Sequence, residues 1–134
     1  MKKLQHLHLI IRAIGDGRKI VPSVDTEKLL NLSLERLVSD IGMKVVLPAR
    51  CFYVSAKGNE GYTGQVAIET SHIAYHIWDD LSLIQFDLYT CGDLTTKQIQ
   101  MAMDWVEHWM GTGKMDFMVL NRENGIVPVV VDFE

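Results

Sequence analysis

The side chains with the clearest capacity for chemistry lie near the middle of the chain, at Ser71, His72, His76 and Cys91. The two histidines are four residues apart, so they share a face on a helix and also on a strand. Two imidazoles could hold zinc, although no carboxylate or thiol stands beside them at ligand spacing. Cys91 with His76 could also form a nucleophilic pair. The pattern alone favours a third interpretation, in which the histidines are buried and hydrogen-bonded and the cysteine is a small apolar side chain.

Strands are expected to carry these residues. The β-branched and aromatic neighbours of His76 predict a strand over Ile73–Trp78. Apolar and polar residues alternate through Leu83–Thr90, which is typical of a half-buried strand. His72, His76 and Trp78 should then face the same side. Four further strands are expected at Leu7–Ile14, Lys44–Val54, Gln65–Ile68 and Met115–Leu120, with a glycine-bearing loop over Ser55–Gly64.

Two helices complete the predicted fold. Apolar residues recur at helical spacing from Leu30 to Ile41, after start signals at Pro22-Ser23 and before Gly42. A second helix is expected over Lys97–Met110, ended by glycines. The element order predicts an α+β fold, a two-layer sandwich with an antiparallel sheet and both helices packed on one face. No repeat or composition break divides residues 1–134, so one domain is expected.

Composition excludes several classes of protein. The 134 residues are 48% apolar and 22% charged, the balance of a globular protein. The net charge of −4 argues against nucleic acid as a partner, and no apolar run is long enough to span a membrane. The lysines at the N-terminus resemble a weak signal peptide, but His6, His8 and Arg12 interrupt the apolar run. Two cysteines form neither a disulfide framework nor a metal site, which favours free thiols in the cytoplasm.

The residues around Ser71 resemble those of the short prokaryotic S-adenosylmethionine decarboxylases, which depend on a pyruvoyl group. That family carries Glu-Ser-His, a second histidine four residues later, Thr-Trp-Pro-Glu, and then Asp-apolar-aromatic-Thr-Cys-Gly. This chain has Thr70–Asp80 and Asp87–Gly92 at the same intervals. Tyr62-Thr63-Gly64 resembles the apolar-Ser-Gly that precedes the cleavage strand, and Phe52 matches an aromatic that follows a basic position.

The resemblance implies a cofactor made from the chain itself. A decarboxylase of α-amino acids needs a sink for the electrons left on Cα, which side chains do not supply. A pyruvoyl ketone supplies one by forming a Schiff base with the substrate amine. In the family, the serine hydroxyl attacks the preceding carbonyl, and β-elimination from the resulting ester leaves the pyruvoyl group. Carried over, Ser71 is the pyruvoyl precursor and the Thr70–Ser71 bond is the one cleaved.

The remaining roles are also implied by the resemblance. His76 corresponds to the base that removes the serine α-proton during processing, and Cys91 to the acid that returns a proton to the substrate Cα. Thr63 stands at the position of a serine that aids processing. Phe52 would stack on adenine, and Asp80 would bind the ribose hydroxyls, although a core aromatic and a solvated turn residue are the alternatives. No metal ligand is implied.

The chain departs from the family pattern near the cleavage point. Thr70 replaces the family's glutamate, and its β-branching would slow an acyl shift that still acts on the backbone. Asp79-Asp80 replaces Pro-Glu, and Ala56–Glu60 resembles an insertion. The expected function is a self-processed S-adenosylmethionine decarboxylase for polyamine (spermidine) synthesis, working as a homodimer whose protomers complete each other's sites. The alternatives are a pyruvoyl-dependent decarboxylase of arginine or ornithine, and an uncleaved, non-catalytic homologue that binds a partner or ligand.

Overall fold

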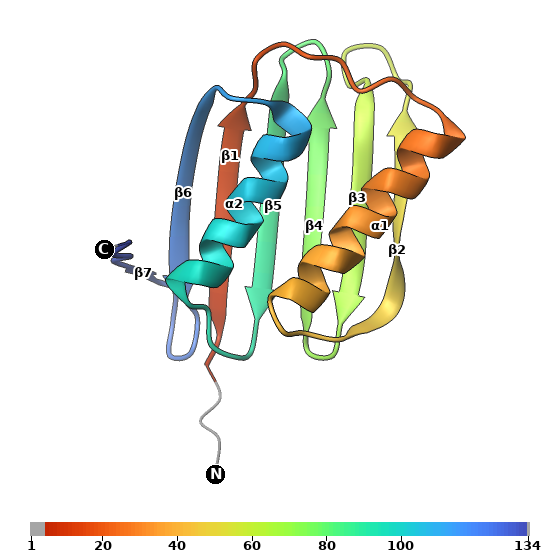
Figure 1. The fold of residues 1–134 in the computed structure, drawn as a ribbon. Helices are drawn as coiled ribbons and strands as arrows, with labels where there is room; N and C mark the ends of the chain where they lie inside the picture. Colours follow the sequence, from red (N-terminus) through yellow and green to blue (C-terminus); the bar gives the residue numbers. More distant parts are fainter. Residues whose placement is uncertain (1–4, 134) are drawn as a thin grey trace.

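The structure, a computed structural model, describes residues 5–133 and consists of one antiparallel sheet with two helices across one face (Figure 1). The first lysines of the sequence lie outside the described residues. The order of the sheet is β2-β3-β4-β5-β1-β6-β7. Its strands are β1 (Leu7–Ile14), β2 (Val45–Val54), β3 (Gly61–Ile68), β4 (Ser71–Trp78), β5 (Leu83–Thr90), β6 (Lys114–Asn121) and β7 (Val127–Val129). The predicted α+β sandwich with both helices on one face is confirmed.

The helices begin at side-chain caps that the sequence supplies. In α1 (Val24–Asp40) the Ser23 hydroxyl accepts a hydrogen bond from the Thr26 amide at 3.0 Å. In α2 (Thr96–Met110) Thr95 and Gln98 form a reciprocal capping box. Both helices turn an apolar face toward the sheet, where burial of that face stabilises them. The buried residues are Leu30, Leu34, Leu37 and Val38 of α1, and Ile99, Ala102, Trp105, Val106 and Met110 of α2.

The two faces of the sheet differ because alternate side chains point to opposite sides. Beneath the helices lies the core, which β1 and β5 supply with Leu9, Ile11, Phe86 and Leu88 among others. The opposite face, called the open face below, carries the intervening side chains, and no helix within residues 5–133 covers it. It includes large apolar side chains such as Phe52, which is 70% exposed.

The prediction of a loop over Ser55–Gly64 is wrong at its end, because β3 begins at Gly61. Gly61 and Gly64 are required in β3 because neighbouring atoms leave no room for a side chain, and not because the chain turns there. A Cβ on Gly61 would lie 1.8 Å from the Ile77 carbonyl oxygen, and one on Gly64 would lie 2.3 Å from the Tyr75 ring. Strand β7 was not predicted. It pairs with β6 at the edge of the sheet.

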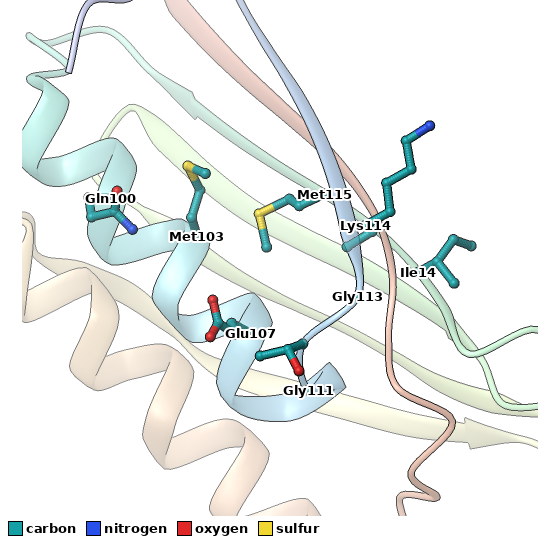
Figure 2. Close-up of a pocket in the computed structure, with 10 residues that line it drawn as sticks. Ile14, Gln100, Met103, Glu107, Gly111, Gly113, Lys114 and Met115 are labelled. Atoms are coloured by element: carbon teal, nitrogen blue, oxygen red, sulfur yellow. The ribbon is translucent and has the colours of Figure 1, made fainter.

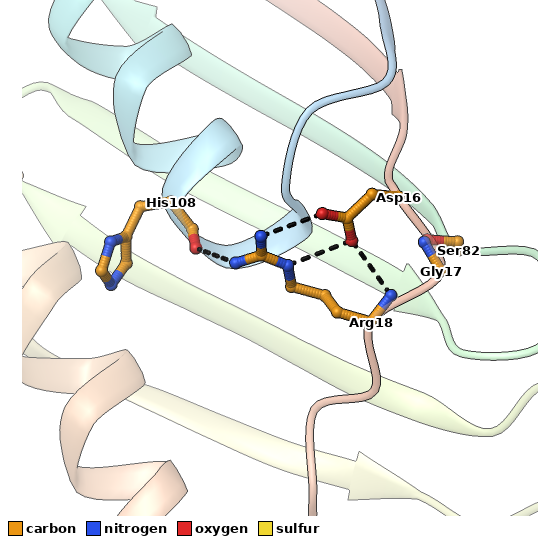
Figure 3. A network of polar contacts seen from close by, with 5 residues as sticks. All are labelled: Asp16, Gly17, Arg18, Ser82 and His108. Atoms are coloured by element: carbon orange, nitrogen blue, oxygen red, sulfur yellow. Dashed lines mark hydrogen bonds and ion pairs between the residues drawn. The ribbon is translucent and has the colours of Figure 1, made fainter.

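A polar network fastens the β1–α1 connection to the end of α2 (Figure 3). Arg18 pairs with the Asp16 carboxylate at 2.9 Å and donates to the His108 carbonyl oxygen at 3.4 Å. The Ser82 hydroxyl accepts from the Gly17 amide at 3.2 Å. Arg18 therefore brings positive charge to the C-terminus of α2, where the helix dipole favours it. The hydrogen bonds from Arg18 lower the pKa of Asp16 below its usual value of 3.8.

We expect Asp16→Asn to lower the melting temperature at neutral pH. Because the folded-state pKa of Asp16 is depressed, its stabilising contribution is complete above 3.8 and is lost as the pH falls through the folded-state value. The melting temperatures of wild type and variant should therefore converge in acid. Asp40→Asn is the control. The ion pair of Asp40 with Arg36 is long, at 3.9 Å, and the Arg36 side chain is mostly exposed, so its loss should change the melting temperature little. Equal melting temperatures for Asp16→Asn and wild type at pH 7 would contradict this prediction.

Candidate active site

The predicted cleavage point lies at a tight turn that opens into a cavity of about 340 Å³. Ile68 at the end of β3 pairs with Ser71 at the start of β4, so Glu69 and Thr70 form the turn. The Thr70 amide donates to the Ile68 carbonyl oxygen at 2.8 Å. Thr70 is exposed and Ser71 is half-buried. The cavity is lined by the turn, by the segments Ile41–Lys44 and Thr90–Asp93, and by Gln98.

Cys91 lies against the predicted cleavage point. Its Sγ is 2.6 Å from Oγ1 of Thr70. The cysteine directly follows β5, whose last residue, Thr90, is buried and accepts a hydrogen bond from the Gly92 amide at 3.0 Å. Because Thr90 is anchored in the sheet, this bond holds the backbone on both sides of Cys91. The thiol and the Thr70–Ser71 bond therefore share one end of the sheet.

A second group of predicted residues lies on the open face. Phe52, Thr63 and His76 stand directly opposite one another across β2, β3 and β4. Nδ1 of His76 is 3.0 Å from Oγ1 of Thr63, within hydrogen-bond distance. Phe52 continues this row toward the sheet edge with most of its ring exposed. The row provides an imidazole, a hydroxyl and a free aromatic surface side by side.

The two groups do not meet within one copy of the chain. Ser71 and His76 are five residues apart on the same strand, a separation of about 17 Å at about 3.3 Å per residue. An odd spacing also directs their side chains to opposite faces. Cys91 contacts Thr70 beside Ser71, so it does not pair with the distant His76. His72 and His76 are about 13 Å apart along β4, so they do not form a zinc pair.

Of the two acidic residues after Trp78, the structure engages the first. Asp79 accepts a hydrogen bond from the Tyr53 hydroxyl at 2.8 Å, which raises the pKa of Tyr53 to about 12. Asp80 is exposed in the turn, and it has no hydrogen-bond partner among residues 5–133. The Ala56–Glu60 segment lies beside this turn, because the Asp79 amide donates to the Glu60 carbonyl oxygen at 2.8 Å.

A separate cavity of about 210 Å³ lies between α2 and β6 (Figure 2). Met103 and Met115 face its interior from the helix and the strand, with Glu107 nearby. None of the predicted site residues lines it. The two cavities share no lining residue, so this one lies apart from the predicted cleavage point.

Sequence reasoning missed two residues beside His72. Its Nε2 is 3.3 Å from Oδ2 of Asp87, which also contacts Nε2 of His8 at 2.7 Å. The carboxylate that was missing at ligand spacing along the sequence is therefore supplied by a neighbouring strand. Alternation through Leu83–Thr90 put Asp87 on the polar side of its strand, and Leu7–Ile14 was predicted only as a short apolar strand. Neither pattern gave the register between strands.

Comparisons with known proteins agree with the motif. A family model described as S-adenosylmethionine decarboxylase matches residues 12–123. An S-adenosylmethionine decarboxylase proenzyme of Archaeoglobus fulgidus is 31% identical over 90 residues, covering 64% of this chain and 79% of that protein. The proenzyme of Acidithiobacillus ferrooxidans is 27% identical over 89 residues, covering 63% of this chain and 65% of that one. This chain therefore covers just under two thirds of the length of the Acidithiobacillus ferrooxidans proenzyme.

A solved structure extends the likeness to the whole fold. The crystal structure of the adenosylmethionine decarboxylase from Aquifex aeolicus matches with a TM-score of 0.64 and 26% identity, over 100% of this chain and 98% of that one. No helix of the described residues has the length and apolar character needed to cross a membrane. The family match, the shared fold and the Ser71 and Cys91 motifs agree, and the chain belongs to the S-adenosylmethionine decarboxylase family.

Proposed function

We propose that this chain is a self-processing, pyruvoyl-dependent decarboxylase of S-adenosylmethionine, acting in polyamine synthesis. The observation that carries the proposal is the contact of Cys91 with Thr70 at the predicted cleavage point, 2.6 Å from sulfur to oxygen. The relatives named above are proenzymes, a name that fits activation by cleavage. The family match gives no support to arginine or ornithine as substrate.

Processing would begin at Ser71. Its hydroxyl attacks the Thr70 carbonyl carbon, the peptide C–N bond breaks, and an ester replaces it. Removal of the Ser71 α-proton then expels residues 1–70 as a carboxylate and leaves dehydroalanine at position 71. Tautomerisation to an imine and hydrolysis by solvent water convert this residue into the pyruvoyl group and release ammonia. The residues present fit this chemistry, because the scissile bond lies at an exposed turn with a cavity on one side. When formed, the pyruvoyl group would supply the electron sink that decarboxylation requires.

The remaining side chains would bind substrate and move protons. Cys91 lies beside the cleavage point, where its thiol can donate a proton at Cα. The exposed Phe52 ring offers a surface on which adenine can stack, and Asp80 has a carboxylate without a competing partner for the ribose hydroxyls. Two free cysteines favour a reducing cytoplasm as the location.

The base for processing would come from a second copy of the chain. His76 lies about 17 Å along β4 from Ser71, so it does not reach the α-proton of its own chain. The open face, where His76 lies, also exposes apolar side chains such as Ile10, Phe52 and Met118. A homodimer that buries this face would bring His76 and Thr63 of one copy to the Ser71 of the other.

Mixing two inactive variants tests this arrangement. Ser71→Ala lacks the nucleophile and His76→Ala lacks the base, so neither should cleave when expressed alone. In a mixed dimer, the His76→Ala chain keeps Ser71 and meets His76 of the other copy. We therefore expect cleavage of the His76→Ala chain alone, up to half of all chains in mixed dimers, seen by intact mass. Cleavage of His76→Ala by itself, or none in confirmed mixed dimers, would refute exchange of the base between copies.

The substrate is tested separately. Purified, processed protein is incubated with S-adenosylmethionine labelled in its carboxyl group, and released carbon dioxide is counted. Arginine and ornithine labelled in the same position are the comparators. Release from S-adenosylmethionine alone is the expected result. Release only from a basic amino acid would transfer the proposal to that substrate, and full-length chain with no release would favour a non-catalytic homologue.

A further inference from the structure

Helix α1 has apolar side chains on the side that faces away from the sheet. Leu29 and Leu32 are 59% and 63% exposed, and Asp25 and Arg36 are exposed on the same helix. At about 100° per residue, these four side chains lie within about 60° of one another around the helix axis. They form a stripe, called the outer stripe below, on the opposite side of α1 from its buried residues.

The outward side of α2 has no such stripe. Both helices cover the same face of the sheet (Figure 1), so they meet the same surroundings. Single exposed apolar residues are common on protein surfaces and need no explanation, but Leu29 and Leu32 are neighbours on one side of a helix. The exposed residues of α2 are all polar or charged: Thr96, Lys97, Gln100, Asp104, Glu107 and His108.

The spacing of the outer stripe is that of a helix that packs against another helix. From Asp25 the steps to Leu29, Leu32 and Arg36 are four, three and four residues. Alternating steps of this kind average about 3.5 residues, the repeat at which two packed helices present their contact positions to each other. The two leucines occupy the middle of the stripe, and one charge of each sign lies at each end.

The outer stripe is complementary to a second copy of itself. The midpoint between Leu29 and Leu32 in the sequence is also the midpoint between Asp25 and Arg36. Two α1 helices that pack antiparallel around this point therefore place Leu29 of one copy against Leu32 of the other. The same arrangement places Asp25 against Arg36, and a two-fold axis makes each contact twice. A parallel arrangement in register would place each charge against its own kind.

The two charged side chains are available for such a contact. Arg36 is 83% exposed, and its contact with Asp40 is long, at 3.9 Å. An exposed ion pair of this kind contributes little, so Arg36 can turn to another carboxylate. Asp25 makes no ion pair with any residue of the described part of the chain.

We propose that the outer stripe of α1 binds the outer stripe of a second copy of this chain, antiparallel, with the leucines at the centre and two Asp25–Arg36 ion pairs at the ends. The homodimer proposed above buries the open face, whereas α1 covers the other face of the sheet (Figure 1). The outer stripes of both copies therefore stay exposed, on opposite sides of the homodimer. The contact links homodimers one after another in a row, because it does not close on a fixed number of chains.

Exchange of the two charges tests the contact and its direction. Sedimentation velocity of the full chain over a series of concentrations should show a wild-type mass above two chains that rises with concentration. Asp25→Arg sets two arginines against each other at both ends of the contact, and Arg36→Asp sets two aspartates. Each variant should weaken association by about tenfold, because two attractive pairs become two like-charge pairs. In an equimolar mixture of the two variants opposite charges meet again, so association should return.

Two further variants separate the stripe from net charge and from folding. Asp104→Arg changes the net charge as Asp25→Arg does, but on the exposed side of α2, and it should associate like wild type. Leu29→Gln combined with Leu32→Gln removes the apolar centre and should abolish association. Circular dichroism confirms that each variant is folded. A mixture that associates no better than its two components, or equal association of Asp25→Arg and wild type, would overturn the proposal.

The α1 contact and the proposed function can fail independently. If the open face does not form a homodimer, the α1 contact alone gives two chains per particle, and Asp25→Arg gives single chains. That result would refute the open-face homodimer and support the α1 contact. Cleaved, active wild type whose mass is the same as that of Asp25→Arg at every concentration would refute the contact and leave the proposed function standing.

Discussion

Ser71→Ala is expected to remain one full-length chain under conditions in which the wild type separates into residues 1–70 and 71–134. Alanine has no hydroxyl to attack the Thr70 carbonyl carbon, so the ester never forms and the loss of cleavage should be complete. Intact mass spectrometry and a denaturing gel measure it directly. Decarboxylation of S-adenosylmethionine should disappear with it, because the electron sink is not formed.

Thr70→Val is the matched control. Valine keeps the shape of threonine and the scissile carbonyl, and it removes only the neighbouring hydroxyl that contacts Cys91. Cleavage should continue in this variant, at a rate that shows what the contact contributes. Wild-type protein that stays whole through long incubation at neutral pH would end the processing proposal. Cleavage of Ser71→Ala with none in Thr70→Val would show that the wrong hydroxyl had been assigned.

The regular elements were predictable where one face is buried and the other is not. In β5, Ile84, Phe86 and Leu88 face the helices while the residues between them are polar, so the strand has the predicted bounds. Strand β1 also has its predicted bounds, because its apolar run ends at the turn signal Gly15-Asp16-Gly17. Helix α1 was recognisable from apolar spacing together with Ser23, whose side chain does cap its first turn. In each case the signal is local, and tertiary contacts strengthen the same preference.

Prediction failed where tertiary contacts override a local preference. Gly61 and Gly64 have the composition of a loop, but the neighbouring strand approaches so closely that only glycine fits. Strand β7 consists of Val127–Val129, all exposed, and it exists because β6 offers a free edge. Apolar residues that recur every two positions, as in a strand, or every 3.6 positions, as in a helix, reveal neither a free sheet edge nor a close approach between strands.

The candidate site was predictable only in part, for the same reason. Ser71 and Cys91 were placed by a motif at fixed spacing, and the structure brings Thr70 and Cys91 together at one cavity. The motif did not predict that His76 would lie far from Ser71, toward the other end of β4. The cluster of His8, His72 and Asp87 was invisible, because its register depends on three strands separated by long stretches of chain.

Cys91→Ala should separate processing from turnover. If Cys91 is the acid that returns a proton to the substrate Cα, its loss should slow turnover by about 10²–10⁴-fold, the usual contribution of general acid catalysis. Cleavage should continue, because the scissile bond and Ser71 are unchanged. Single-turnover decarboxylation, measured on protein confirmed as cleaved, gives the rate per processed chain.

The alternative is that Cys91 only fills space, and Cys51→Ala separates the two. Cys51 packs beneath the helices, and burial raises the pKa of its thiol, so that variant should lower the melting temperature while leaving turnover per folded chain almost unchanged. Cys91→Ala should slow turnover per folded chain and leave the melting temperature almost unchanged. The mass of the 71–134 fragment adds a second readout, since protonation at the wrong carbon leaves the substrate nitrogen on a fragment that then begins with alanine. Normal turnover in Cys91→Ala, without that mass change, would remove the thiol from the reaction.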